Sequence, residues 1–221
     1  MSNQLVIPSY KNELENLMKQ LGQMLPAEQL AVFNADAEQL AKKHPSPLRL
    51  KNGDQAPYFS LPNATGNVVR LEDLLKEGPV VLTFYRGAWC PYCNLQLKQY
   101  QQILHNIKDA GATLVAISPQ TPDHSLDMQQ KNELAFEVLS DSGNQVARLF
   151  TTVFKYGDAP LQAMTDLGYD FHSFYDDDSG EIPVPATFVI AQNGTITFAA
   201  SEGGDYRQRV EPEAVLNALR Q

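Results

Sequence analysis

Apolar side chains recur at spacings of three and four through residues 10–43, which places them on one face of a helix. Pro26 interrupts this pattern, and His44-Pro45-Ser46-Pro47 ends it. The sequence therefore predicts two helices in an N-terminal helical extension, residues 1–48. We expect these helices to pack on the core of the protein or on a second copy of the chain, so a homodimer is one possible assembly.

From residue 49 the pattern changes to alternating strands and helices. Continuous apolar runs at residues 80–85 and 113–117 are typical of strands buried on both faces. Gln192-Asn193-Gly194, between two further apolar runs, predicts a hairpin. The other expected elements are short strands at 58–61 and 68–71, a strand near 136–139, and helices from Cys90 or Pro91 to about Lys108, from Thr121 to about Asn132 and from Glu211 to about Arg220. This order predicts an α/β domain with a mixed sheet, residues 49–221.

Residues 151–184 interrupt this domain as an insertion. They are rich in aromatic and acidic side chains and show no firm period. We expect a short helix and a long loop here. The acidic run Asp176-Asp177-Asp178 is interpreted as a solvated face rather than a metal site.

Composition and charge exclude several classes of function. The chain has 221 residues, 43% of them hydrophobic, and a net charge of −9, which argues against a nucleic-acid or anionic-membrane surface. No apolar run approaches the roughly 18 residues of a membrane span, and residues 1–8 lack the features of a secretory signal. We therefore expect a cytoplasmic protein. The four histidines form no local cluster, so the sequence implies no metal and no bound cofactor.

The chain's two cysteines, Cys90 and Cys93, stand two residues apart between a predicted buried strand and a predicted helix. Unpaired N–H groups and the partial positive charge of a helix N-terminus stabilise a thiolate, which is the nucleophilic form of cysteine. In a reducing compartment such a pair is more often catalytic than structural. The first sulfur should be more exposed and nearer the partial charge, which favours Cys90 as the attacking thiolate and Cys93 as its resolving partner.

This strand–Cys-x-x-Cys–helix unit resembles the active site of thioredoxin-fold proteins. Val184-Pro185-Ala186-Thr187, just before a predicted strand, resembles the loop in which those proteins place a cis proline beside the reactive cysteine. The resemblance implies a cis bond before Pro185. The alternative is a trans proline that begins an edge strand.

From about residue 50 to the C-terminus the chain further resembles the peroxiredoxin-like proteins of the alkyl hydroperoxide reductase/thiol-specific antioxidant (AhpC/TSA) family. The motifs that carry the resemblance are Gly53-Asp54-Gln55-Ala56-Pro57-Tyr58-Phe59-Ser60-Leu61, Phe84-Tyr85-Arg86-Gly87-Ala88-Trp89-Cys90-Pro91-Tyr92-Cys93, Ile117-Ser118-Pro119-Gln120, Leu139-Ser140-Asp141, Pro183-Val184-Pro185-Ala186-Thr187-Phe188 and Asp205-Tyr206-Arg207-Gln208-Arg209. It implies a thioredoxin-like fold, with a mixed central sheet flanked by helices, and a thiol-dependent peroxidase.

The site also departs from that family's pattern. On the motif Pro-x-x-x-(Thr/Ser)-x-x-Cys, Arg86 takes the proline position, Cys90 the hydroxyl position and Cys93 the peroxidatic position. This register reverses the roles that exposure suggests for the two cysteines. The family's late arginine falls on Pro185, and Cys-Pro-Tyr-Cys is itself a common glutaredoxin sequence.

Three further side chains are candidates for supporting the reaction. Arg86 could supplement the helix charge or form an ordinary surface ion pair. Arg209 could replace the missing arginine if its loop folds over the site. Trp89 could shield a disulfide on one side or serve only in packing.

These features leave three functional hypotheses. The first is a peroxidase that cycles Cys90 and Cys93 between dithiol and disulfide and is restored by thioredoxin, glutaredoxin or glutathione. The second is a disulfide reductase acting on protein or glutathione disulfides. The third is a non-enzymatic protein whose cysteines switch its assembly through the N-terminal helices.

Overall fold

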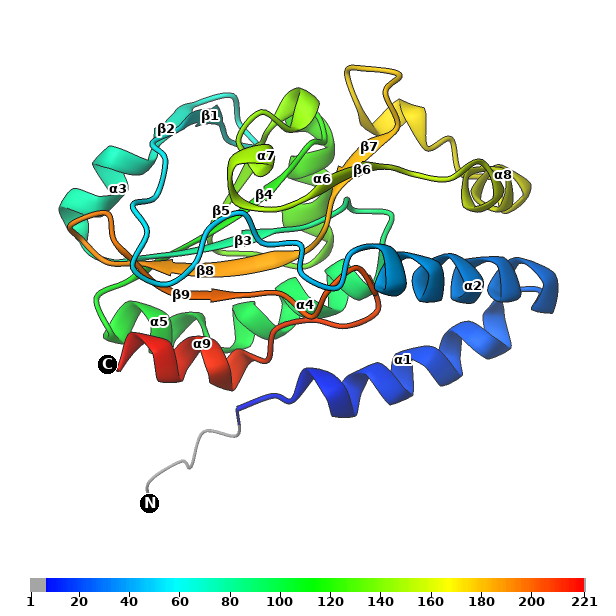
Figure 1. Cartoon of the computed structure of the whole chain (residues 1–221), viewed down its shortest axis with the longest axis horizontal. Coiled ribbons are helices and arrows are strands. Elements are labelled where there is room, and N and C mark those ends of the chain that lie inside the picture. The colour runs from blue at the N-terminus through cyan, green and yellow to red at the C-terminus, as the bar shows by residue number, and fades with distance from the viewer. Residues whose placement is uncertain (1–6, 221) are drawn as a thin grey trace.

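A five-stranded mixed sheet forms the centre of the protein in the computed structural model, which describes residues 7–220 (Figure 1). Residues 1–6 and residue 221 lie outside the described residues. Residues 1–6 are most of the segment that was interpreted above as lacking a secretory signal. The strand order is β5-β4-β3-β8-β9, with β3 (Val80–Phe84) at the centre, β4 (Thr113–Ser118) and β5 (Glu137–Ser140) on one side, and β8 (Ala186–Ile190) and β9 (Ile196–Ala200) on the other. β3, β4 and β5 are parallel, and β8 is antiparallel to both β3 and β9. The predicted α/β fold and the hairpin at its end are confirmed.

Both faces of this sheet are covered, which explains why every residue of β3 is buried. On one face lie α4 (Pro91–Gln102), α5 (Leu104–Asp109) and α9 (Pro212–Leu219) (Figure 1). On the other lie α3 (Leu71–Glu77) and α7 (Ala147–Phe150), with the short antiparallel pair β1 (Ser60–Pro62) and β2 (Val68–Arg70). The helix α6 (Pro122–Lys131) joins β4 to β5, and its Met128 belongs to the same buried cluster as the residues of α4.

The long helix expected from residue 90 to 108 is divided in two. Ile103, at the junction of α4 and α5, has φ −96° and ψ 5°, which takes it out of helical geometry. Its side chain is wholly buried. The chain therefore bends at a core residue, which apolar spacing alone does not reveal.

The N-terminal extension consists of α1 (Tyr10–Met24) and α2 (Ala27–Lys43), as predicted, with Pro26 at the N-cap of α2. Both helices pack on their own chain, α1 against α4 and α2 against α8 (Asp158–Asp166). The loop after β9 presses against the end of α2. A Cβ atom at Gly204 would lie 2.1 Å from the carbonyl oxygen of Leu40, so only glycine fits there.

Residues 151–184 are more ordered than the expected short helix and long loop. Besides α8 they contain the 3-10 turn η2 (His172–Phe174) and the antiparallel strands β6 (Val153–Lys155) and β7 (Glu181–Pro183). Strands of three residues are too short to produce a recognisable alternation.

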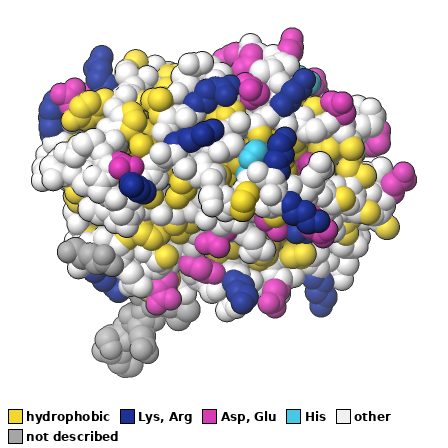
Figure 2. Space-filling model, viewed as in Figure 1, with side chains coloured by type: hydrophobic (Ala, Val, Ile, Leu, Met, Phe, Trp, Pro, Cys, Tyr) yellow, Lys and Arg dark blue, Asp and Glu magenta, His cyan; other side chains and the backbone are white. Residues whose placement is uncertain are grey.

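Acidic and basic side chains are interspersed over the face of the molecule seen in Figure 2. Within residues 7–220 no helix has the length and apolar character needed to cross a bilayer.

Candidate active site

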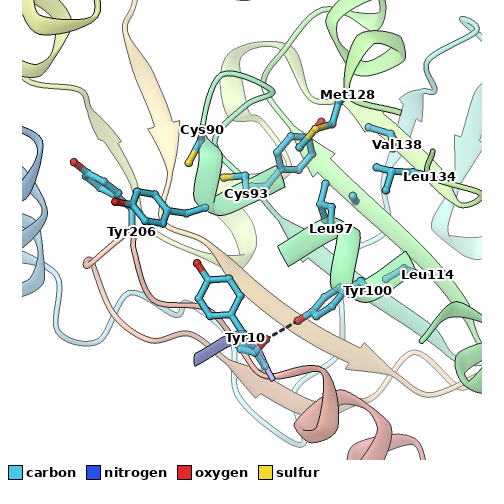
Figure 3. Close-up of a cluster of buried hydrophobic side chains, with 14 of the residues drawn as sticks. Tyr10, Cys90, Cys93, Leu97, Tyr100, Leu114, Met128, Leu134, Val138 and Tyr206 are labelled. Carbon is cyan, nitrogen blue, oxygen red and sulfur yellow. Dashed lines mark hydrogen bonds between the residues drawn. The ribbon is translucent and has the colours of Figure 1, made fainter. Parts of the chain in front are cut away.

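Both cysteines lie at the start of α4, directly after the short turn that follows β3 (Figure 3). Cys90 is the N-cap residue and Pro91 occupies the first helical position, where its missing N–H costs nothing. The carbonyl oxygen of Cys90 accepts hydrogen bonds from the N–H groups of Cys93 and Asn94, each at 3.1 Å. Both cysteines have 0% exposure. The expected greater exposure of Cys90 is therefore wrong, because other parts of the chain cover the helix N-terminus.

Arg209 reaches the cysteines from the loop between β9 and α9. Its Nη2 lies 3.2 Å from Cys93 Sγ and 4.0 Å from Cys90 Sγ. Its Nη1 donates to the carbonyl oxygens of Tyr206 and Gln208, so the guanidinium is held by its own loop. The loop folds over the site in the way that the sequence analysis required for Arg209 to replace the missing arginine.

The two thiols differ in proton affinity. Burial raises the pKa of Cys93, but a hydrogen bond from Cys90, the charges of Arg209 and Arg86 and the N–H of Arg86 together hold that pKa well below the ordinary value. Burial raises the pKa of Cys90, and the hydrogen bond with Cys93 and the negative charge on Cys93 raise it further. The site thus favours a thiolate on Cys93 and a protonated thiol on Cys90.

Arg86 is buried, with 1% exposure, in a box of aromatic rings. Its guanidinium carbon lies 3.8 Å from the centre of the Tyr206 ring and 4.7 Å from the centres of the Trp89 and Tyr156 rings. Within residues 7–220 its Nε and Nη2 have no hydrogen-bond partner. The surface ion pair considered for Arg86 is therefore wrong, and cation–π contacts are what stabilise its charge directly.

Trp89 is part of this box and is fixed by the 151–184 insertion. Its Nε1 donates to the hydroxyl of Tyr175 at 2.8 Å, and that hydroxyl donates to the carbonyl oxygen of Arg86 at 3.1 Å. A Cβ at position 87 would lie 2.5 Å from Trp89 Nε1, so Gly87 allows the indole to fold back. Sequence reasoning missed Tyr156 and Tyr175, and their only signal was the aromatic richness of the insertion.

Pro185 is buried immediately before β8, the position expected for it. The predicted cis bond is wrong, since no peptide bond among the described residues is cis. A trans bond keeps the chain extended from β7 into β8, where the N–H of Val184 donates to the Thr152 carbonyl at 2.8 Å. The Pro185 carbonyl accepts the Ser201 hydroxyl at 2.7 Å, which ties the same segment to the loop after β9.

The AhpC/TSA family model matches residues 52–199, a range that includes β3, the cysteines and the β8–β9 hairpin. The chain belongs to the AhpC/TSA family. Among its relatives, peroxiredoxin Bcp of Escherichia coli is 33% identical over 133 residues, 60% of this chain and 83% of Bcp. A candidate peroxiredoxin of Mycobacterium tuberculosis is 34% identical over 136 residues, 62% of this chain and 84% of that protein.

Solved structures agree with this membership. Peroxidoxin BcpB of Mycobacterium tuberculosis aligns with a TM-score of 0.60 at 26% identity, over 77% of this chain and 97% of that one. The predicted thioredoxin-like fold and the class of thiol-dependent oxidoreductase are thereby confirmed. The family match begins after the N-terminal helices and ends before Arg209.

Proposed function

We propose that this protein is a thiol-dependent peroxidase in which Cys93 attacks the peroxide and Cys90 resolves the product. The observation that carries the assignment is the 3.2 Å contact between Arg209 Nη2 and Cys93 Sγ in a site where Cys90 is the more distant sulfur. The motif register, which puts Cys93 at the peroxidatic position, supports the same assignment. Exposure, the argument that favoured Cys90, does not distinguish two sulfurs that are equally buried.

The first step transfers one oxygen atom. The Cys93 thiolate attacks the terminal oxygen of a hydroperoxide, the S–O bond forms as the O–O bond breaks, and an alkoxide or hydroxide departs. Cys90, held protonated, supplies the proton that neutralises this leaving group. The charge of Arg209 beside the sulfur stabilises the negative charge that spreads onto the oxygens as the O–O bond breaks.

The second step closes the disulfide. The Cys90 thiolate left by the first step attacks the sulfur of the Cys93 sulfenic acid, and the S–S bond forms as hydroxide leaves and is protonated to water. Dithiol and hydroperoxide are thus converted to disulfide, alcohol and water, a balanced two-electron reaction.

An external thiol must reduce the disulfide to restore the dithiol, which requires a reducing compartment. We propose that this compartment is the cytoplasm. Thioredoxin, glutaredoxin and glutathione have the required chemistry. A yeast mitochondrial 1-Cys peroxiredoxin of the same fold, 15% identical, was solved in connection with thiol resolution through glutathione and thioredoxin systems.

Stopped-flow oxidation of the reduced wild type, Cys90→Ser and Cys93→Ser by hydrogen peroxide tests the proposal. Cys90→Ser should react rapidly and stop at a sulfenic acid that dimedone traps, while Cys93→Ser should fall to the rate of a free thiol. Fast reaction surviving only in Cys93→Ser would reverse the roles. Slow reaction in all three proteins would favour the disulfide reductase, and an oligomer change on oxidation without turnover would favour the redox-switched assembly.

A further inference from the structure

The dithiol is covered by segments outside the AhpC/TSA match. Tyr10 of α1 and Tyr206 of the loop after β9 belong to the same buried cluster as Cys90 and Cys93 (Figure 3). Burial raises the pKa of the Tyr10 hydroxyl, and the next largest effects on that pKa come from the charges of Arg209, Cys90 and Cys93. The N-terminal extension therefore packs in the same buried cluster as the dithiol.

A set of polar contacts fastens the beginning of α1 to the Arg209 loop. The Glu211 carboxylate accepts the N–H groups of Tyr10 at 2.7 Å and Lys11 at 2.9 Å, which are unpaired donors at the helix N-terminus. The Tyr10 hydroxyl donates to the Arg207 carbonyl at 2.7 Å. We call these three hydrogen bonds the α1 clasp.

Three further hydrogen bonds, which we call the second seam, fasten α2 and its C-cap residue to the same loop. The Tyr206 hydroxyl donates to the Phe33 carbonyl at 2.6 Å, and Arg207 Nη1 donates to Asn34 Oδ1 at 3.1 Å. The N–H of Gly204 donates to the His44 carbonyl at 2.8 Å. Both helices of the extension thus hold the loop that carries Arg209.

We propose that the α1–α2 hairpin is a size filter that restricts this peroxidase to small hydroperoxides such as hydrogen peroxide and excludes bulky hydroperoxides. The inference rests on the proposed function, whose substrate class it narrows. A molecule little larger than water reaches a buried sulfur through side-chain rotations, which are frequent. A bulky oxidant needs the clasp and the seam to separate, and such local opening is rare because several hydrogen bonds break together.

The double variant Tyr10→Phe/Glu211→Ala tests the filter, because it removes the clasp without altering the side chains of Arg209 or either cysteine, and the Arg209 guanidinium keeps its bonds to its own loop. Glu15→Ala, which removes an exposed carboxylate from the same helix, is the matched control. Stopped-flow rates with hydrogen peroxide and with cumene hydroperoxide would be compared in these proteins and the wild type. Reaction of the reduced proteins with iodoacetamide and with fluorescein-5-maleimide would report access without using peroxidase activity.

In the wild type and in Glu15→Ala, cumene hydroperoxide should react about 100-fold more slowly than hydrogen peroxide. The double variant should react about tenfold faster or more with cumene hydroperoxide and with the maleimide. The reason is that losing hydrogen bonds to a charged group shifts the equilibrium toward the open state by about this factor. Its rates with hydrogen peroxide and iodoacetamide should stay within about threefold. Asn34→Ala, which loosens only the second seam, should raise the rates with cumene hydroperoxide and the maleimide relative to those with hydrogen peroxide and iodoacetamide by a smaller factor. This single variant keeps the test valid if the double variant folds poorly.

Equal wild-type rates with both hydroperoxides, or maleimide labelling that is no faster in the double variant or Asn34→Ala than in the wild type, would overturn the filter. If hydrogen peroxide oxidises the wild type no faster than a free thiol while the maleimide rate still rises in the variants, the cover stands and the proposed peroxidase function fails.

Discussion

The two arginines of this site present one chemical group in contrasting surroundings. Arg209 comes from the loop after β9 and directs a nitrogen at a sulfur 3.2 Å away, whereas Arg86 follows β3 and is surrounded by three aromatic rings. Both are buried, and neither forms an ion pair with a carboxylate within residues 7–220. We therefore propose that Arg209 acts directly on the reacting sulfur, while Arg86 orders the aromatic box and adds charge at a greater distance.

Each arginine also lies beside a different segment of the chain, and only the N-terminal helices lie outside the family match. Arg209 and its loop are held by the N-terminal helices through the α1 clasp and the second seam. Arg86 is boxed partly by Tyr156 of the insertion, and its charge opposes the rise that burial causes in the pKa of Asp36 on α2. The N-terminal helices and the insertion therefore border the candidate site from two sides.

The largest expected effect is a difference between the two arginine variants in the rate of reaction with hydrogen peroxide. Arg209→Met should lower the second-order rate with hydrogen peroxide about 100-fold or more, the usual cost of removing one preorganised donor from a developing negative charge. Arg209→Lys keeps the charge without the planar fork and should recover part of the loss. Arg86→Met should lose about tenfold or less, measured by stopped flow at one pH. A larger loss for Arg86→Met than for Arg209→Met would invert the comparison.

The pH dependence sharpens the same contrast. In Cys90→Ser a serine hydroxyl can donate in place of the thiol, and Arg209, Arg86 and the Arg86 N–H still lower the pKa of Cys93. The 240 nm thiolate absorbance of this variant should therefore persist below the ordinary thiol pKa of about 8.5 and vanish only at lower pH. Adding Arg209→Met removes a stabiliser of the thiolate, so the titration midpoint should move to higher pH. Arg86→Met should move it in the same direction by less. A midpoint unaffected by Arg209→Met would show that this guanidinium does not stabilise the thiolate.

Tryptophan fluorescence should be affected more by the loss of Arg86 than by the loss of Arg209, the reverse of the order expected for the reaction rate. Trp89 is the only tryptophan in the chain, and Arg86 lies over its ring. Arg86→Met should therefore shift the emission spectrum of the folded protein, because it removes a charge from the indole face, and Arg209→Met should leave the spectrum nearly unchanged. Equal shifts in both variants would mean that losing the Arg209 bond to the Tyr206 carbonyl disturbs the aromatic box as much as losing Arg86 does.

The smallest effect is expected from Tyr175→Phe. The change leaves Trp89 Nε1 without its acceptor and should lower the free energy of unfolding by about 1–2 kcal/mol, measured by urea denaturation. The rate with hydrogen peroxide should stay within about threefold, since Tyr175 supports the box and not the sulfur. Tyr169→Phe, an exposed tyrosine of the same insertion, is the control.

The strand–dithiol–helix unit could be predicted because its signals are local. A continuous apolar run requires a buried strand, and a proline after Cys90 suits the first position of a helix. The resemblance marked Arg209 only as a candidate, on the condition that its loop folds over the site. Unlike the strand–dithiol–helix unit, that condition depends on which distant segments pack together.

What failed depended on such packing. The exposure of Cys90 was judged from its own helix, but Cys90 is buried, and Arg209 of the loop after β9 lies 4.0 Å from its sulfur. The bond before Pro185 was assigned by resemblance, although local hydrogen bonds of Val184 and Pro185 are satisfied with a trans bond. The aromatic residues of the insertion carry no period, so nothing in their order shows that Tyr156 and Tyr175 face Arg86.

The clasp between Tyr10 and Glu211 joins residues 201 positions apart in the chain. During synthesis the N-terminal helix therefore leaves the ribosome long before the glutamate that caps it exists. The sheet strands and both cysteines are translated in that interval, so a nascent chain presents its dithiol without cover and without Arg209. Until residue 211 emerges, the thiols of the growing polypeptide are open to bulky oxidants that the size filter of the finished molecule would exclude.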